Sequence, residues 1–251
     1  MKTCLTVLAT ASLSLCASCM RPNVRASDHS LIRGDEPVTE GSGVAVLPDS
    51  SIYKGDFRNG RFNGNGVLTR RDGTQYTGEF KDGLFTGHGI LLNRMSKYEG
   101  SFKDGLPCGR GIHTDVRGGR YEGEFVDSQY CGYGMQSNQS YRYEGTFTNS
   151  LRHGKGVMTY TNGDRYEGAF VDGTFSGNGK LTRATGDTYV GHFAEGLFDG
   201  EGEFTWGVGG TYRGEFKSGV FDGHGMLTYA DGQTQEGIWR RGRHVESGSN
   251  L

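Results

Sequence analysis

The stretch YKGDFRNGRFNGNG, residues 53–66, decides the fold because its pattern recurs along most of the chain. A tyrosine starts each copy, a glycine stands two positions later, a phenylalanine two positions further on, and a Gly-x-Gly pair completes the stretch. Successive tyrosines are 22 or 23 residues apart: Tyr53, Tyr76, Tyr98, Tyr121, Tyr143, Tyr166, Tyr189 and Tyr212, with Gln235 at the next position. A fixed period of this length indicates a repeat architecture, in which each unit packs on its neighbours.

Each unit contains the signals of a β-hairpin. Alternation in Tyr-x-Gly-x-Phe places the tyrosine, glycine and phenylalanine on one face of a strand. Dipeptides such as Asn59-Gly60 and Asp82-Gly83 then favour a tight hairpin turn, because both residues tolerate a positive φ. A second short strand follows the Gly-x-Gly pair. We therefore predict an all-β fold, an elongated antiparallel meander of stacked hairpins in a single twisted sheet, with about 17 strands spanning roughly 80 Å.

The motif Tyr-x-Gly-x-Phe-x-x-Gly-x-x-x-Gly-x-Gly resembles the MORN repeat, named for a membrane occupation and recognition nexus. The resemblance covers residues 41–243 as eight full repeats with a half-repeat at either end. It implies a shared repeat fold more than a shared function, with possible membrane association. It leaves residues 1–18, 19–40 and 244–251 outside the array.

Composition excludes several functional classes. Glycine accounts for 45 of 251 residues, and the 13 Tyr, 14 Phe and 2 Trp supply the core, which argues against a helical bundle. The net charge of −2 provides no basic field for nucleic acid. Because a separate catalytic domain has no room beside the array, we expect no enzyme activity and no small-molecule substrate.

The first 18 residues are typical of a signal peptide. Lys2 precedes an uncharged stretch that is too short to span a bilayer comfortably. Ala17 and Ser18 stand directly before Cys19, as in the cleavage site of a bacterial lipoprotein, which predicts that Cys19 carries the lipid. Cleavage after Ser18 or Ala26 without lipid is the alternative. Residues 19–40 then form a flexible tether to the membrane of the cell envelope, or the protein is secreted.

A column of carboxylates follows the tyrosines. It contains Glu99, Glu122, Glu144 and Glu167, and Glu236 stands later in the same column. These side chains should face away from the rings and could form an acidic surface for a basic partner or divalent cations. An ordinary solvated strand face is the alternative.

A second aromatic column recurs after each hairpin turn. It contains Phe62, Phe85, Tyr130, Phe175, Phe198 and Phe221, and it is interrupted by Pro107 and Arg152. We expect this column to pack across repeats; the alternative is a peptide groove. The glycine between Tyr and Phe is where we expect a ring to lie against bare backbone.

Histidines and cysteines do not form a catalytic or metal-binding pattern. His88 and His224 occupy the variable place inside Gly-x-Gly, and His113, His153 and His192 fall in three different columns, so we expect no metal, cofactor or catalytic site. Cys108 and Cys131 share a column in adjacent repeats, about 10 Å apart at a two-strand spacing, which is too far for a disulfide. We expect two free thiols.

The fourth repeat is irregular. Ser128 replaces a turn glycine, residues 136–140 are polar where other repeats have an apolar strand, and Ser150 repeats the first change. Sequence drift or a bend or partner contact could explain it.

The sequence as a whole favours a non-enzymatic, exported scaffold or adaptor that binds a protein partner or itself. The alternative is a lipid- or glycan-binding module that uses exposed aromatics of the array.

Overall fold

The computed structural model describes residues 38–245, which divide into two compact units, an N-terminal unit of residues 38–138 and a C-terminal unit of residues 139–245. The signal peptide, Cys19 and residues 19–37 of the tether lie outside the described residues, as do residues 246–251. Every regular element of the described chain is a β-strand.

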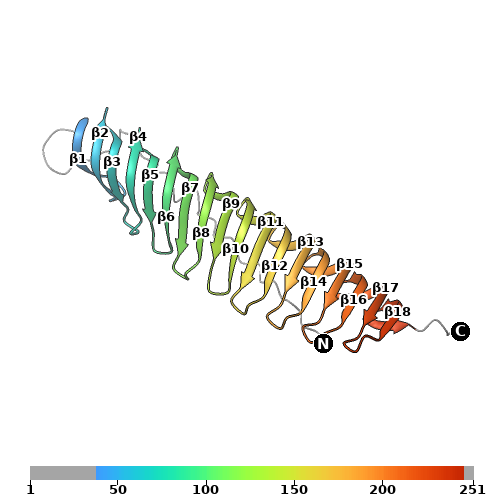
Figure 1. Cartoon of the computed structure of the whole chain (residues 1–251). Coiled ribbons are helices and arrows are strands. Elements are labelled where there is room, and N and C mark those ends of the chain that lie inside the picture. Colours follow the sequence, from blue (N-terminus) through green and yellow to red (C-terminus); the bar gives the residue numbers. More distant parts are fainter. Residues whose placement is uncertain (1–37, 246–251) are drawn as a thin grey trace. The chain divides into compact units, whose positions relative to one another are not determined.

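The strands follow one another as an antiparallel meander. The N-terminal unit contains β1 (Glu40–Val46), β2 (Ile52–Arg58), β3 (Arg61–Thr69), β4 (Gln75–Lys81), β5 (Leu84–Leu92), β6 (Ser96–Lys103), β7 (Leu106–Asp115), β8 (Arg120–Val126) and β9 (Gln129–Ser137). The C-terminal unit contains β10 (Tyr141–Thr148), β11 (Leu151–Tyr160), β12 (Arg165–Val171), β13 (Thr174–Thr182), β14 (Thr188–Ala194), β15 (Leu197–Thr205), β16 (Thr211–Lys217), β17 (Val220–Thr228), β18 (Thr234–Arg240) and β19 (Arg243–Val245). Within each unit the strands lie side by side in chain order (Figure 1). The predicted all-β meander is confirmed.

Tight turns join the two strands of each repeat. Between β2 and β3, Asn59 and Gly60 both have a positive φ, 50° and 68°. This backbone matches the twist of the flanking strands, and Phe57 pairs with Phe62 directly beyond it. The Asn-Gly and Asp-Gly dipeptides therefore act as the predicted hairpin turns.

The described residues contain nineteen strands rather than about 17. Strand β1 is the expected half-repeat and pairs with β2. The partial repeat after Gln235 contributes two strands, because the chain turns again after Arg240 and β19 pairs with β18. Strands thus begin at Glu40 and continue to Val245.

The core of six of the eight full repeats is a stack of aromatic rings. In the repeat that starts at Tyr76, the Tyr76 ring stacks on Phe85 with a centroid distance of 3.7 Å and an interplanar angle of 11°. Phe80 of the same repeat and Phe102 of the next repeat contact Tyr76 edge-on, at 5.1 and 5.0 Å. Aromatic pairs of this geometry contribute about 0.5–1.5 kcal/mol beyond the area they bury. Contact with the next repeat is therefore part of this ring stack.

The tyrosine ring also explains two of the recurring glycines. A Cβ atom on Gly89 would lie 2.5 Å from the hydroxyl oxygen of Tyr76, and one on Gly78 would lie 2.7 Å from it. The Tyr76 hydroxyl donates a hydrogen bond to the Glu79 carbonyl oxygen at 2.9 Å. As predicted, the ring lies against bare backbone, where any side chain would displace it.

Burial changes the ionisation of these tyrosines. Loss of hydration raises the pKa of Tyr189 and of Tyr212 to about 12, above the ordinary value near 10. The phenols consequently stay protonated and keep donating to the backbone throughout the physiological range.

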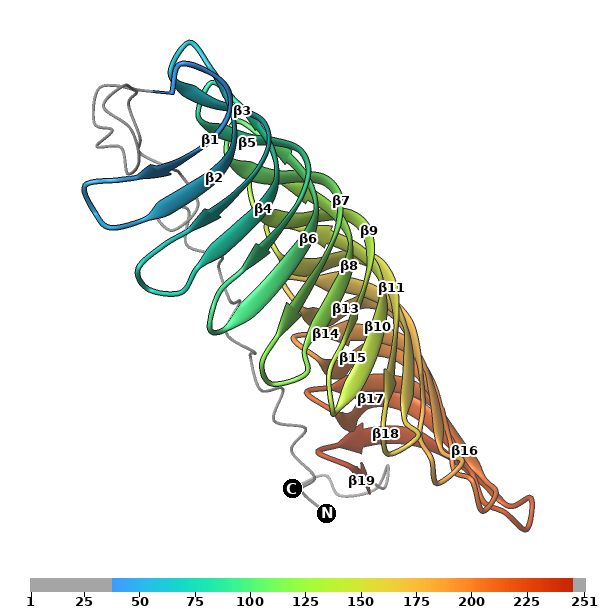
Figure 2. The same cartoon turned by 90° about the vertical axis from the view of Figure 1, so that its left-hand side faces the viewer.

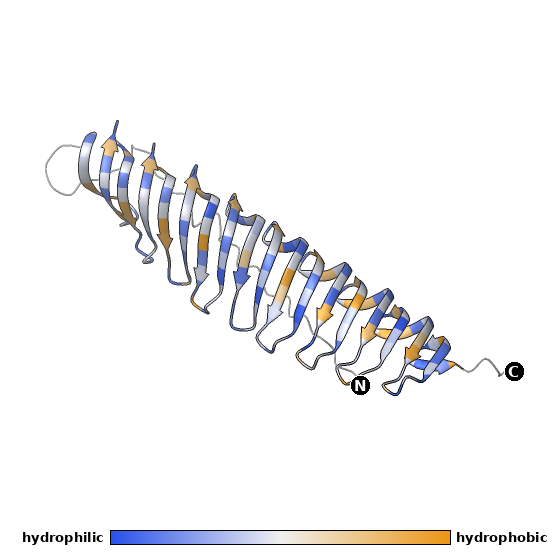
Figure 3. Cartoon of the chain, viewed as in Figure 1, coloured by the Kyte–Doolittle hydropathy of each residue, from blue (hydrophilic) through white to orange (hydrophobic). Residues whose placement is uncertain are grey.

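Side chains alternate between the two faces of each strand. Figure 3 shows hydrophilic and hydrophobic residues interspersed along the strands. The paired strands of a repeat also shift register between Gly78 and Glu79, an irregularity that recurs in other repeats. Such bulges bend strands, and the strands of the N-terminal unit curve along their length in Figure 2. The rings occupy one face, which we call the inner face, and the residues between them form the outer face.

Candidate interaction surface

The four glutamates singled out in the sequence lie on the outer face, two in each unit. Their side chains remain 41–57% exposed. Each stands directly after a buried tyrosine, so strand alternation turns it away from the rings. The location expected for this column is therefore the one the structure shows.

Each of these glutamates has an ion-pair partner two residues earlier on its own strand. In the N-terminal unit Lys97 pairs with Glu99 at 2.7 Å and Arg120 with Glu122 at 2.8 Å. In the C-terminal unit the pairs are Arg142–Glu144 at 3.4 Å and Arg165–Glu167 at 2.7 Å. Residues i and i+2 of a strand share a face, so this pairing is a signal that the sequence itself contains.

These pairs change the charge of the surface. The hydrogen bond and positive charge of Lys97 hold the pKa of Glu99 below its ordinary value. Exposed ion pairs contribute little to stability, about 0–1 kcal/mol each. Because each glutamate is paired with a lysine or arginine, the column is a row of compensated charges rather than a purely acidic stripe.

Apolar side chains separate the charged ones across the strands. Glu99 lies opposite Ile90 on one side and Ile112 on the other, and Glu122 lies opposite Ile112 and Met135. In the C-terminal unit Val157 stands in the same way between Glu144 and Glu167. Charged and apolar positions thus alternate from β5 to β9 and from β10 to β12, which suits a protein surface better than a metal ion.

The second aromatic column belongs to the core. Phe62 and Phe85 are 1% exposed, and each ring lies 3.7 Å from the tyrosine it stacks on. Phe62 also contacts Phe80 of the next repeat, and Phe85 contacts Phe102, both edge-on at a centroid distance of 5.9 Å. The expected packing across repeats is confirmed, and these buried rings line no peptide groove. Among the described residues, Tyr133 and Tyr229 are the tyrosines with large exposed area.

At Arg152, where this column lacks an aromatic ring, a cation–π contact replaces the stack. The guanidinium carbon lies 5.2 Å from the centroid of Tyr141 and 5.8 Å from that of Tyr143. The planar cation covers the ring face that phenylalanine covers elsewhere.

His113 occupies a buried position where five other repeats have leucine or methionine. It is 4% exposed, and its Nδ1 lies 2.7 Å from the hydroxyl oxygen of Tyr130. Tyr98 and Tyr121 flank it in register on the neighbouring strands. Loss of hydration lowers the pKa of His113, and the charge of Asp115 opposes that shift. His113 and Tyr130 belong to different columns of the repeat, so the motif alone does not connect them.

Two further histidines and the two cysteines of the array form no common site. His88 and His224 are exposed on the outer face. Cys108 and Cys131 are free thiols, and burial raises the pKa of both. No group of three or more His, Cys, Asp or Glu side chains within residues 38–245 could hold a metal ion.

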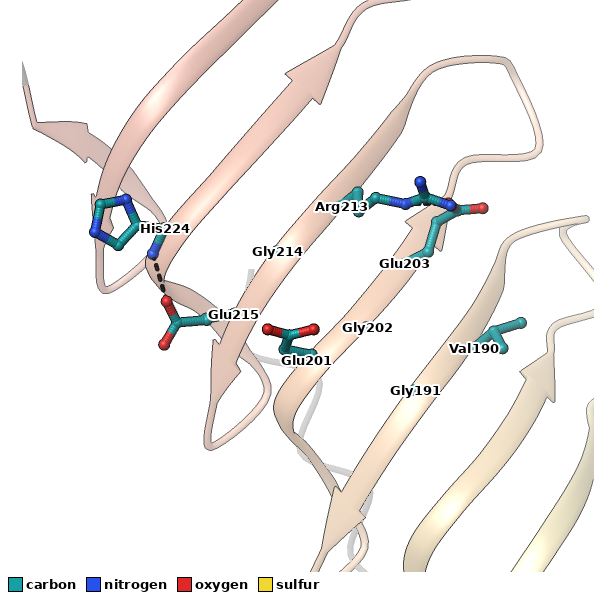
Figure 4. Close-up of a pocket in the computed structure, with 9 residues that line it drawn as sticks. All are labelled: Val190, Gly191, Glu201, Gly202, Glu203, Arg213, Gly214, Glu215 and His224. Atoms are coloured by element: carbon teal, nitrogen blue, oxygen red, sulfur yellow. Dashed lines mark hydrogen bonds and ion pairs between the residues drawn. The ribbon is translucent and has the colours of Figure 1, made fainter.

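A shallow depression of about 740 Å³ marks the outer face of the C-terminal unit (Figure 4). Its lining comprises Val190, Gly191, Glu201, Gly202, Glu203, Arg213, Gly214, Glu215 and His224. Arg213 pairs with Glu203 at 2.8 Å, and the Glu215 carboxylate accepts a hydrogen bond from the backbone N–H of His224 at 2.9 Å. Its open form and paired charges resemble a contact surface more than a small-molecule site.

A family model for the MORN repeat matches this architecture repeat by repeat. The matched segments are residues 53–75, 76–92, 98–120, 121–138, 143–165, 166–188, 189–211 and 212–234. The chain belongs to the MORN repeat family. Two of the matched MORN segments, 76–92 and 121–138, are shorter than the rest. In these two repeats the next repeat tyrosine comes after 22 residues rather than 23.

Other comparisons place no further function on the MORN array. No curated protein matches the sequence. The TCP domain of SAS-4 from Drosophila Melanogaster, solved with a proline-rich motif of Ana2, has 8% identity and a TM-score of 0.29, covering 84% of this chain and 97% of that one. BamB from Moraxella catarrhalis has 9% identity and a TM-score of 0.19, covering 87% and 99%. Likenesses at these TM-scores support no argument about function.

No helix within residues 38–245 is both long and apolar enough to cross a membrane.

Proposed function

We propose that this MORN array is a non-enzymatic scaffold that binds protein partners through its outer face. The observation that carries the proposal is that each repeat uses one face of its strands for packing and leaves the other face exposed. The tyrosine and phenylalanine columns are used in internal packing, whereas the residues between them stay exposed as paired charges separated by apolar side chains. Such a mixed face resembles ordinary protein–protein interfaces, in which polar and apolar groups intermix.

We further propose that the scaffold works in a bacterial cell envelope, attached through a lipid on Cys19. The support is the sequence of residues 1–19, with its uncharged stretch and the small residues before the cysteine. A lipid anchor would hold the array at a membrane without spanning it. The charge-compensated outer face gives no reason for the array itself to attract anionic lipids.

Intact mass and membrane fractionation test the anchor. We expect the protein expressed in a bacterium to begin at Cys19, to carry acyl mass and to sediment with membranes, whereas Cys19→Ala releases it. A mature protein that begins elsewhere without added mass contradicts the anchor. The released protein then tests the lipid- or glycan-binding alternative by co-sedimentation with liposomes or polysaccharide.

Crosslinking in intact cells tests the scaffold. A photoreactive residue at Thr77, on the outer face, should crosslink to a defined protein, whereas one at Phe85, inside the ring stack, should not. Charge reversal at Glu99 and Glu122 together should weaken that crosslink. Equal crosslinking from both positions, or none from any outer-face position, would refute a binding role for this face.

A further inference from the structure

One row of outer-face residues in the C-terminal unit has a symmetric order. It contains one residue from each strand from β10 to β18, and every member is the register partner of the next. The row is Glu144, Val157, Glu167, Lys180, Val190, Glu203, Arg213, Met226 and Glu236. We call it the outer row.

Reading the outer row outward from Val190 pairs unlike charges and like apolar groups. The first neighbours on the two sides are Lys180 and Glu203, which have opposite charges. The second neighbours, Glu167 and Arg213, are opposite again. The third neighbours, Val157 and Met226, are both apolar, and only the two ends of the row, both glutamates, are alike in charge. Reversed, the row is complementary to itself.

A second row beside it keeps the face even. Threonines are register partners on six successive strands: Thr182, Thr188, Thr205, Thr211, Thr228 and Thr234. Short side chains of equal size let another sheet approach closely from β13 to β18, and Arg165 continues the row on β12. The same position in the N-terminal unit mixes Thr69 and Thr114 with the longer Leu92, Lys97 and Arg120.

The centre of the outer row offers both apolar area and an uncompensated charge. Val190 is 51% exposed and Met226 is 39% exposed. Lys180 is exposed and has no ion-pair partner within residues 38–245, because the neighbouring Glu167 is paired with Arg165. Figure 4 shows Val190, Glu203 and Arg213 side by side on β14, β15 and β16.

We propose that this face docks a second copy of the same chain. The two outer rows run in opposite directions about a two-fold axis parallel to the strands at β14, so that each Val190 faces its mate. Lys180 of one copy then faces Glu203 of the other, and Glu167 faces Arg213. A two-fold interface of this kind uses the same patch on both subunits. The inference rests on the proposed scaffold function, for which it names one partner.

The size of the face sets the expected strength. Seven strands and three side-chain positions measure roughly 30 by 14 Å, so each copy buries on the order of 400 Å². This is about half of the ~800 Å² per partner in a standard interface, which indicates a weak, concentration-dependent dimer. Charge complementarity then provides the register more than the affinity.

Analytical ultracentrifugation of the purified full chain over a wide concentration range tests the proposal. We expect a reversible monomer–dimer equilibrium that Lys180→Glu and Glu203→Lys each weaken about tenfold, since each places like charges opposite one another. The double variant Lys180→Glu/Glu203→Lys should restore the dissociation constant to within about threefold. Lys54→Glu, at an exposed outer-face position of the N-terminal unit, is the matched control and should change nothing.

Three outcomes would overturn the inference. They are a monomer at every concentration, a dimer that Lys54→Glu weakens while Lys180→Glu does not, and single variants that the double swap fails to rescue. Far-UV circular dichroism shows that each variant is folded. A protein that is monomeric yet still crosslinks to another protein in cells refutes self-docking and leaves the scaffold function standing.

Discussion

The repeat that begins at Tyr76 and the repeat that begins at Tyr121, both in the N-terminal unit, build the same ring stack from different residues. Tyr76 stacks on Phe85, and Tyr121 stacks on Tyr130, at 3.7 Å in both cases with interplanar angles of 11° and 8°. The extra hydroxyl of Tyr130 is accommodated because His113, two strands away on β7, contacts it. The ring geometry is therefore a constraint of the fold, while polarity can change if a hydrogen-bonding partner changes with it.

The regular stack should be the most sensitive to truncation. Phe85→Ala removes a ring that is 1% exposed, and we expect a loss of about 3–5 kcal/mol in the free energy of unfolding. Urea denaturation followed by circular dichroism measures it. Thr77→Ala, exposed on the neighbouring strand β4, is the control and should stay within about 0.5 kcal/mol. A loss below about 1 kcal/mol for Phe85→Ala would show that the ring stack does not stabilise the unit.

The stack of Tyr121 on Tyr130 should be sensitive to a much smaller change in a side chain. Tyr130→Phe removes only the hydroxyl and leaves His113 buried without that partner, so we expect a loss of about 1–3 kcal/mol. Adding His113→Leu recreates the side chains of the regular repeats and should recover most of it. A double-mutant cycle with no coupling between the two sites would contradict the paired role.

The same histidine should make the unit acid-sensitive, with a smaller effect than the loss of the hydroxyl. Burial lowers the pKa of His113 in the folded protein, whereas the unfolded chain titrates near 6.5. Below that pH the unfolded state takes up a proton that the folded state does not, so stability falls with decreasing pH until the folded pKa is passed. Urea midpoints from pH 7.5 to 5 should fall more steeply for the wild type than for His113→Leu, and parallel curves would refute the assignment.

The difference between these repeats also marks what the sequence could predict. Period, turn dipeptides and alternation place Tyr76, Gly78 and Phe80 on one face, because all three signals act within a few residues. The pairs Lys97–Glu99 and Arg120–Glu122 were equally local and could have been found by the same alternation.

The contact of His113 with Tyr130 could not be read in that way. The two residues are 17 positions apart and belong to different columns of the repeat. Their contact depends on how β7 and β9 are placed around β8, which the register shift in the β8–β9 pair helps to determine. The two-strand contribution of the final partial repeat escaped prediction for a related reason, since β19 lacks the full motif and is defined by its pairing with β18.

The turn of the Tyr121 repeat and that of the Tyr98 repeat before it should differ in strain by a modest amount. Ser128 has a φ of 71°, where the preceding hairpin turn has Gly105 at 85°. A left-handed conformation costs a non-glycine residue about 1–2 kcal/mol. Glycine avoids that cost, but it gives the unfolded chain more conformational entropy, which offsets part of the gain. Ser128→Gly should therefore stabilise the protein by about 0.5–1 kcal/mol. The reciprocal Gly105→Ser should destabilise by a similar amount. Thermal unfolding of both variants measures the pair, and effects of equal sign would show that backbone strain is not the difference.

On the outer face the two kinds of repeat should be nearly interchangeable, which predicts the smallest effect. Glu122→Gln breaks the ion pair with Arg120. The side chains of Arg120 and Glu122 are 41% and 48% exposed, so water already solvates both partners. We expect a loss of about 0.3 kcal/mol at low salt that disappears near 0.5 M salt, because screening weakens exposed pairs. Urea unfolding at two salt concentrations measures it, with Arg120→Gln as the matched partner. A loss above about 1 kcal/mol that persists in salt would mean that the pair stabilises the fold, and the charged face would then be part of the framework rather than a surface that is available to bind.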